Sequence, residues 1–112
     1  MQIEVSNYLL KLGFIPNKYG YRYLADLIVA AACGEEILPL KYVGYVLLSQ
    51  KYGKSAACIE KDIQNAISAA WLKGDVDVLY KEFGETIDMR KGKPGNKQFI
   101  LTALNSLRLL SA

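Results

Sequence analysis

The sequence contains no histidine, only two cysteines and no long apolar run. Without histidine there is no ordinary general base at neutral pH, and neither cysteine has an activating neighbour at a sensible spacing. Cys33 and Cys58 also lack the partners of a zinc site or a disulfide framework, so we expect reduced thiols. We therefore predict that the protein is not an enzyme and that it holds no metal or cofactor.

We also expect neither a membrane-spanning nor a secretory segment. The apolar residues 27–33 fall far short of the roughly 20 residues that a membrane-spanning helix needs. No basic and then apolar leader precedes a cleavage site. Because no repeat or linker divides the 112 residues, we expect one cytoplasmic domain over residues 1–112.

A helical pattern runs along nearly the whole chain. Apolar residues recur at steps of three and four, which predicts an all-α domain of six helices with little or no sheet. The first three helices are expected over residues 5–12, 21–31 and 39–52, each followed by a glycine that can end it. The inner face of the third helix is predicted to consist of Leu40, Val43 and Leu47.

The fourth helix is predicted to be the longest. Ser55 can cap its start and Gly74 can end it. Its apolar stripe consists of Ile59, Ile63, Ala66, Ile67, Ala70 and Trp71. Asp75 and Asn96 are predicted to cap the fifth and sixth helices. The inward residues are predicted to be Val76, Leu79 and Phe83 in the fifth helix, and Phe99, Ala103, Leu104 and Leu107 in the sixth.

The third and fourth helices have the spacing of a helix-turn-helix. Ser49 is small where the two helices would cross, Gly53 lies where the turn favours a left-handed backbone, and Ile59 would fill the gap between the helices. Many helical hairpins also turn at a glycine, and residue 62 is polar where the motif favours an apolar residue. The spacing alone therefore favours a DNA-binding motif only modestly.

The side of the fourth helix opposite its apolar stripe suits the major groove of DNA. Lys61 can donate to guanine, Gln64 can make paired contacts with adenine, and Asn65 can do likewise from slightly off the axis. An ordinary polar face is the alternative, because Glu60 and Asp62 cancel nearby lysines. The residues predicted to point outward are Ala57, Lys61, Gln64 and Ser68.

The net charge of +3 is mild, so its placement matters more than its size. Four cations fall within the eight residues 90–97, "RKGKPGNK", and the candidate phosphate contacts among them are Lys91, Lys93 and Lys97. Lys54 and the helix start at Ser55 are further candidates. From charge alone, a solvated basic loop is the simpler explanation of the cluster.

Three longer segments resemble a known family, in order and without a large gap. They are "LGFIPNKYGYRYLADLI", "IEKDIQNAISAAWLKGDVD" and "FGETIDMRKGKPGNKQFI". Over residues 8–109 the chain resembles the C-terminal DNA-binding effector domain of the sporulation master response regulator of endospore-forming bacteria. The resemblance implies a six-helix domain whose fourth helix enters the major groove of double-stranded DNA, with two copies bound head to tail on tandem boxes.

The resemblance also implies roles for single residues. Glu60 matches a family glutamate that faces the bases, whereas three family arginines fall at Cys58, Lys61 and Gln64. Because lysine and glutamine do not reproduce the contacts of arginine, we expect an altered or weakened sequence preference. The positions that match the family's contact surface for the sigma subunit of RNA polymerase are Val78, Tyr80, Phe83 and Ile87. Phe83 and Ile87 are expected in the core, which leaves Val78 and Tyr80 as the partner contacts.

Two functions stay open from the sequence. The family domain normally follows a phosphorylatable receiver, whereas here the match begins close to Met1, so we expect a stand-alone effector domain. Such a domain is either a sequence-specific transcriptional regulator or a module that pairs or competes with a full-length homologue or with RNA polymerase. The missing arginines favour the module, while the basic loop, Ser55 and Glu60 favour the regulator. A redox switch at Cys58 is a further alternative.

Overall fold

The computed structural model describes residues 1–16, 18–84 and 92–111. The described residues form six α-helices and one short π-helical turn and contain no β-strand, which confirms the predicted all-α class. In chain order the elements are α1 (Gln2–Lys11), α2 (Tyr19–Ala32), the π turn η1 (Leu40–Gly44), α3 (Tyr45–Tyr52), α4 (Ala56–Lys73), α5 (Val76–Phe83) and α6 (Asn96–Ser111).

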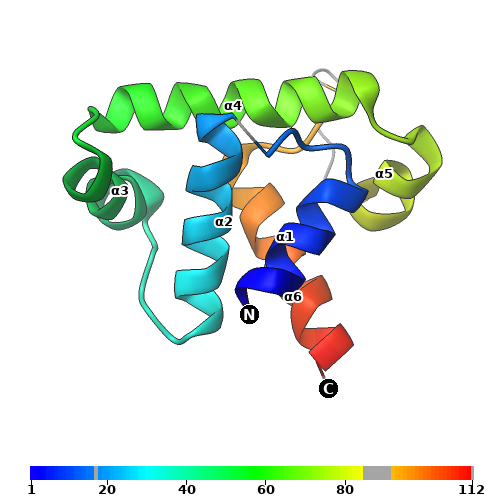
Figure 1. Ribbon diagram of the computed structural model, residues 1–112, viewed down its shortest axis with the longest axis horizontal. Helices are drawn as coiled ribbons and strands as arrows, with labels where there is room; N and C mark the ends of the chain where they lie inside the picture. The colour runs from blue at the N-terminus through cyan, green and yellow to red at the C-terminus, as the bar shows by residue number, and fades with distance from the viewer. Residues whose placement is uncertain (17, 85–91, 112) are drawn as a thin grey trace.

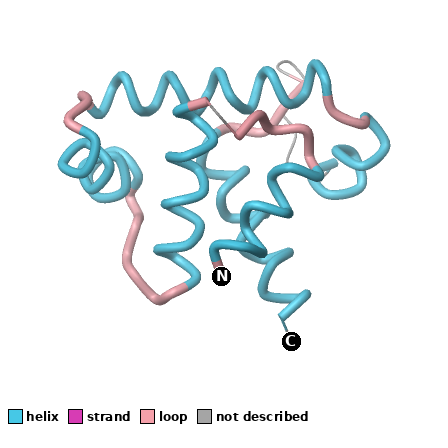
Figure 2. The backbone as a smooth tube through the Cα atoms, viewed as in Figure 1, coloured by secondary structure: helices cyan, strands magenta, loops and turns pink. Residues whose placement is uncertain are grey.

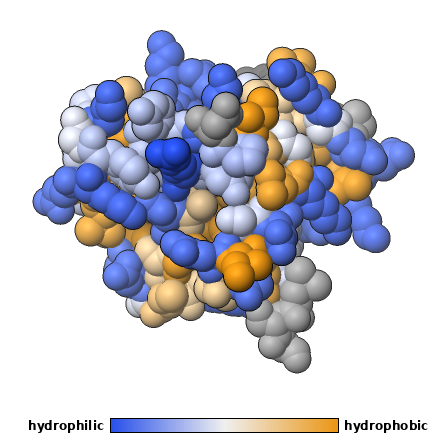
Figure 3. Space-filling model, viewed as in Figure 1, coloured by the Kyte–Doolittle hydropathy of each residue, from blue (hydrophilic) through white to orange (hydrophobic). Residues whose placement is uncertain are grey.

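The long helix α4 spans one side of the molecule, and α1, α2 and α6 pack beneath it (Figure 1). The shorter helices α3 and α5 lie at opposite ends of α4, and loops make up the rest of the path (Figure 2). On the face shown in Figure 3, apolar side chains form separate patches between hydrophilic ones. Among the described residues, no helix combines the length and the apolar character needed to cross a bilayer.

A buried ridge holds α4 on the other helices. Ile59, Ile63 and Ile67 are at most 1 % exposed, as their spacing predicts. Near the other end of α4, the half-buried Trp71 ring meets Phe83 of α5 edge to face, with 5.3 Å between ring centroids. Phe83 in turn stacks on Phe99 of α6 at 5.0 Å. The inward residues predicted for the sixth helix, Phe99, Ala103, Leu104 and Leu107, are also buried.

The predicted inner face of the third helix is wrong. Leu40 is buried, but Val43 is only half-buried and Leu47 is 43 % exposed. The cause is η1, in which the Tyr45 amide donates to the Leu40 carbonyl five residues earlier. A π turn holds one residue more than an α turn, so it shifts the register of every residue after it. Tyr45 and Leu48 therefore take the buried positions of α3.

Asn96 does not cap the sixth helix as predicted, because α6 already begins there. The Gly95 carbonyl accepts a hydrogen bond from the Phe99 amide at 2.9 Å, which puts Gly95 in the cap position. The Asn96 side-chain Nδ2 instead donates to the Tyr45 hydroxyl at 3.0 Å and to the Glu60 carbonyl at 3.2 Å. These two bonds fix the start of α6 against α3 and α4.

Candidate nucleic-acid interface

The turn between α3 and α4 has the geometry of a helix-turn-helix. Gly53 ends α3 with a φ of 69°, a left-handed conformation that residues with a Cβ rarely adopt. Its amide donates to the Ser49 carbonyl at 2.9 Å. Ser55 is extended, and its hydroxyl accepts a hydrogen bond from the Cys58 amide at 3.1 Å, which caps α4 as predicted. Ile59 lies fully buried behind the turn.

Helix α2 braces this turn from the side. The Asp26 carboxylate accepts hydrogen bonds from Lys51 Nζ at 3.0 Å and from the Tyr52 hydroxyl, both on the last turn of α3. The Tyr52 ring also meets the fully buried Tyr23 ring edge to face, with 5.0 Å between centroids. Burial and the Asp26 carboxylate both raise the pKa of the Tyr52 hydroxyl, which therefore stays a donor over the physiological range.

At Gly20 the same helix packs directly against the middle of α4, on its backbone and on the small Ala66 side chain. A Cβ at Gly20 would lie 2.3 Å from the Asp62 carbonyl oxygen and 2.6 Å from the Ala66 Cβ. Both distances are shorter than a van der Waals contact, so only glycine fits. The start of α2 thereby sets the position of α4 relative to the core.

The side of α4 that points away from the core is open. Glu60, Lys61, Gln64 and Asn65, the predicted base-reading residues, are all exposed, as are Ala57 and Cys58. Ser68 is only half-buried, and its hydroxyl donates to the Gln64 carbonyl at 2.9 Å. The positions that match the family arginines therefore lie on an exposed surface. We call Ala57, Lys61, Gln64, Asn65 and Ser68 the outer strip of α4.

The loop before α6 runs along one flank of the outer strip. Lys93 is half-buried, and its ammonium donates to the Ser68 hydroxyl. Lys97 is exposed on the first turn of α6. Lys93 and Asn96 also line a hollow of about 210 Å³ together with Gln64. One predicted phosphate contact, Lys93, thus lies beside the predicted base-reading residue Gln64, whereas Lys91 falls outside the described residues.

The start of α4 carries the other predicted phosphate contacts. Lys54 is exposed at the turn, one residue before the cap. Ser55 is exposed too, but its hydroxyl already accepts from Cys58. An anion at this end would therefore meet the Lys54 ammonium and the free amides of the first turn rather than the Ser55 side chain.

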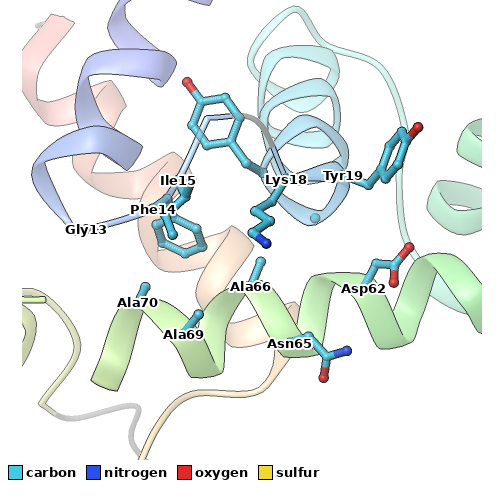
Figure 4. Close-up of a pocket in the computed structure, with 12 residues that line it drawn as sticks. Gly13, Phe14, Ile15, Lys18, Tyr19, Asp62, Asn65, Ala66, Ala69 and Ala70 are labelled. Atoms are coloured by element: carbon cyan, nitrogen blue, oxygen red, sulfur yellow. The ribbon is translucent and has the colours of Figure 1, made fainter. Parts of the chain in front are cut away.

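The opposite flank of α4 contains a hollow that the sequence did not predict (Figure 4). Its volume is about 350 Å³. Its floor is formed by small residues of α4, including Ala66 and Ala69, and its far wall by the connection from α1 to α2. Lys18 extends its ammonium into this hollow, and Asp62 lies toward the end nearer Tyr19 (Figure 4).

The predicted partner contacts lie away from the outer strip, on α5. Tyr80 is 59 % exposed and Val78 is half-buried. Asp75 caps this helix as predicted, since its carboxylate accepts from the amides of Asp77 at 2.9 Å and Val78 at 3.4 Å. Phe83 is fully buried, as expected of a core residue. The Val76 side chain and Ile87 lie outside the described part of the chain.

Six helices, with α3 and α4 joined by a tight left-handed turn and with α4 exposed along one side, are the architecture of a helix-turn-helix DNA-binding domain. Over residues 5–107, nearly the whole chain, the sequence matches the family described as Sporulation initiation factor Spo0A C terminal. The chain belongs to this family. It is a family of DNA-binding domains that regulate transcription in sporulation, and not a class of enzymes.

Proposed function

We propose that the protein is a sequence-specific transcriptional regulator that reads the major groove of double-stranded DNA with α4. The observation that carries this proposal is the exposure of Lys61, Gln64 and Asn65 on a helix whose opposite side is locked into the core by an isoleucine ridge. An α-helix fits the major groove, where each base pair presents a distinct pattern of donors and acceptors. We also propose that this domain binds DNA as a stand-alone effector.

Base reading is divided among four side chains in this proposal. Lys61 donates to guanine O6 and N7, while Gln64 and Asn65 each suit adenine. Glu60 accepts from the amino group of cytosine. Its backbone carbonyl is bonded to Asn96, which holds this part of α4 against α6. Small residues at Ala57 and Ser68 let the helix backbone approach the bases closely.

Affinity in this proposal comes mainly from phosphate contacts, because neutralising phosphates supplies much of the binding free energy. Lys54 and the free amides behind Ser55 bind one phosphate group at the start of α4. Lys93, Lys97 and Lys91 serve the strand beside α6. The cell compartment of action is then the cytoplasm, where bacterial DNA lies.

An interaction module is the second candidate function. It is favoured by the residues Cys58, Lys61 and Gln64 at the positions of three family arginines, since arginine makes the strongest bidentate contacts with guanine. The exposed Tyr80 with Val78 would then contact RNA polymerase, through its sigma subunit, or a homologous regulator. If two copies pair on DNA, this pairing belongs to the regulator function. If the protein pairs with a homologue without DNA, this pairing belongs to the interaction module.

Selection from a random pool of duplex DNA with purified protein separates the two functions. The regulator proposal predicts an enriched motif, whereas an interaction module returns none. A salt titration then measures the slope of log affinity against log salt for the wild type and for a variant carrying Lys61→Arg and Gln64→Arg. The added cation at position 64 should steepen the slope by up to about 0.9 for a phosphate that it neutralises and should shift the preferred base from adenine towards guanine; a slope and a base preference that both stay unchanged contradict the proposed orientation of α4.

A further inference from the structure

The hollow on the α2 side of α4 has a single cationic side chain. Among its lining residues, Lys18 alone carries a positive charge, and its ammonium reaches over the small side chain of Ala66 (Figure 4). Neither of the two ion pairs found in the described part of the chain involves Lys18. The hollow therefore holds an ammonium group without an ion pair among the described residues, with the Asp62 carboxylate on the same lining and the exposed Asn65 of the outer strip at its edge.

The dimensions of DNA decide what would lie there. The major groove is about 12 Å wide, and an α-helix with its side chains is about 10 to 12 Å across. A helix that enters the groove thus nearly fills it, and the two sugar-phosphate backbones must run along the two flanks of that helix. On one flank of α4 lies Lys93, bonded to Ser68; on the other lies the hollow with Lys18.

We infer that the hollow between the α1–α2 connection and α4 seats the phosphodiester backbone of the second DNA strand, with Lys18 as its cationic contact. This inference rests on the proposed function. It adds a protein contact for the DNA strand on the flank of α4 opposite Lys93. Lys18 precedes α2, whose first amides have no side-chain cap, so the field of the helix start adds to that of the ammonium. The small floor residues let the backbone approach α4 closely.

The charge of Asp62 should affect phosphate binding in the direction opposite to that of Lys18. The half-buried Asp62 carboxylate lines the same hollow. A phosphate seated there is repelled by Asp62 and attracted by Lys18. Removing the two charges in turn should therefore change DNA affinity in opposite directions, a pattern that a loss of fold does not produce.

The test measures the affinity of purified full-length protein for its selected duplex over a range of salt concentrations. In Lys18→Gln the slope of log affinity against log salt should fall in magnitude by about 0.9, equally on selected and unrelated DNA, because one phosphate contact is lost. Lys18→Arg should keep the wild-type slope, and Asp62→Asn should bind more tightly than wild type. The matched control is Arg108→Gln, which removes an exposed cation from the last turn of α6 and should leave the slope unchanged, because that end of α6 points away from α4 (Figure 1).

A second measurement locates the contact on the DNA. Neutral methylphosphonates are placed singly along both strands of the duplex, and the position that weakens wild-type binding but not Lys18→Gln binding marks the seated phosphate. An unchanged slope in Lys18→Gln, or a scan in which no position depends on Lys18, overturns the inference while the proposed function stands. Absence of any salt-dependent DNA binding by the wild type overturns both.

Discussion

Gly20→Ala tests most simply how the core positions α4. The substitution adds one methyl group at the point where α2 touches α4. That carbon would meet the Asp62 carbonyl oxygen at 2.3 Å, the Ala66 Cβ at 2.6 Å and the Asp62 carbonyl carbon at 3.0 Å. Two of these atoms belong to the backbone of α4, so no side-chain rotation relieves the overlap, and one of the two helices must move.

The expected loss of stability follows from two opposing effects. Overpacking of a close contact typically costs about 1–3 kcal/mol, and a clash with backbone belongs at the upper end of that range. Gly20 has a helical backbone rather than a left-handed one, so alanine contributes up to about 1 kcal/mol through its better helix propensity. The net destabilisation should be about 2 kcal/mol. DNA affinity should fall as well, because the movement displaces the outer strip.

Urea unfolding of wild type and variant, followed by circular dichroism, measures this loss. The matched control is Gly84→Ala, whose backbone is right-handed and whose added Cβ would, among the described residues, come near only the Tyr80 ring, at 4.0 Å. The control should be neutral or slightly stabilising, by up to about 1 kcal/mol. If Gly20→Ala is as stable as its control, the close approach of α2 to α4 does not exist in solution and the reasoning is refuted.

Three further predictions concern two hydrogen bonds near the interface and the buried tyrosine hydroxyls. Ser55→Ala removes the acceptor of the Cys58 amide and should cost about 1 kcal/mol in urea unfolding, whereas Ser55→Asp should keep most of the stability. Asn96→Ala leaves the Tyr45 hydroxyl and the Glu60 carbonyl without this donor and should cost about 1–3 kcal/mol; a loss well below that would mean that water replaces the amide. Burial raises the pKa of the hydroxyls of Tyr8, Tyr45 and Tyr52, so the folded protein keeps protons that the unfolded chain releases. The contribution of these hydroxyls to stability should therefore be constant below about pH 10 and should fall as the pH rises above it, and a urea midpoint that does not change there contradicts the burial of these hydroxyls.

The helices could be predicted from the sequence because local spacing determines them. Gly53 and the Ser55 hydroxyl act on residues next to them in the chain. The turn and the cap of α4 could therefore be predicted from the sequence. The register of α3 was not readable, because the π turn before it inserts one residue into the helical pattern without any residue that signals it. The role of Asn96 was misjudged for a related reason: its partners, Tyr45 and Glu60, lie far away in the chain.

The candidate site was predictable only in part. The exposure of Lys61, Gln64 and Asn65 follows from the step of three to four that buries their neighbours on the same helix. Lys18 was missed, because it lies in a connection with no periodicity and its place beside α4 depends on tertiary packing. The one local signal was the glycine at Gly20, whose lack of a side chain permits another helix to approach that closely.

The central claim is that the outer strip of α4 faces base edges in the major groove. It is tested most directly by replacing single guanines of the selected duplex with 7-deazaguanine, which removes the N7 acceptor and leaves base pairing intact. The account predicts at least one position where the replacement weakens wild-type binding by about 1–3 kcal/mol but leaves the binding of Lys61→Ala unchanged. If every position affects the two proteins equally, Lys61 does not read the groove and the proposed orientation of α4 is wrong.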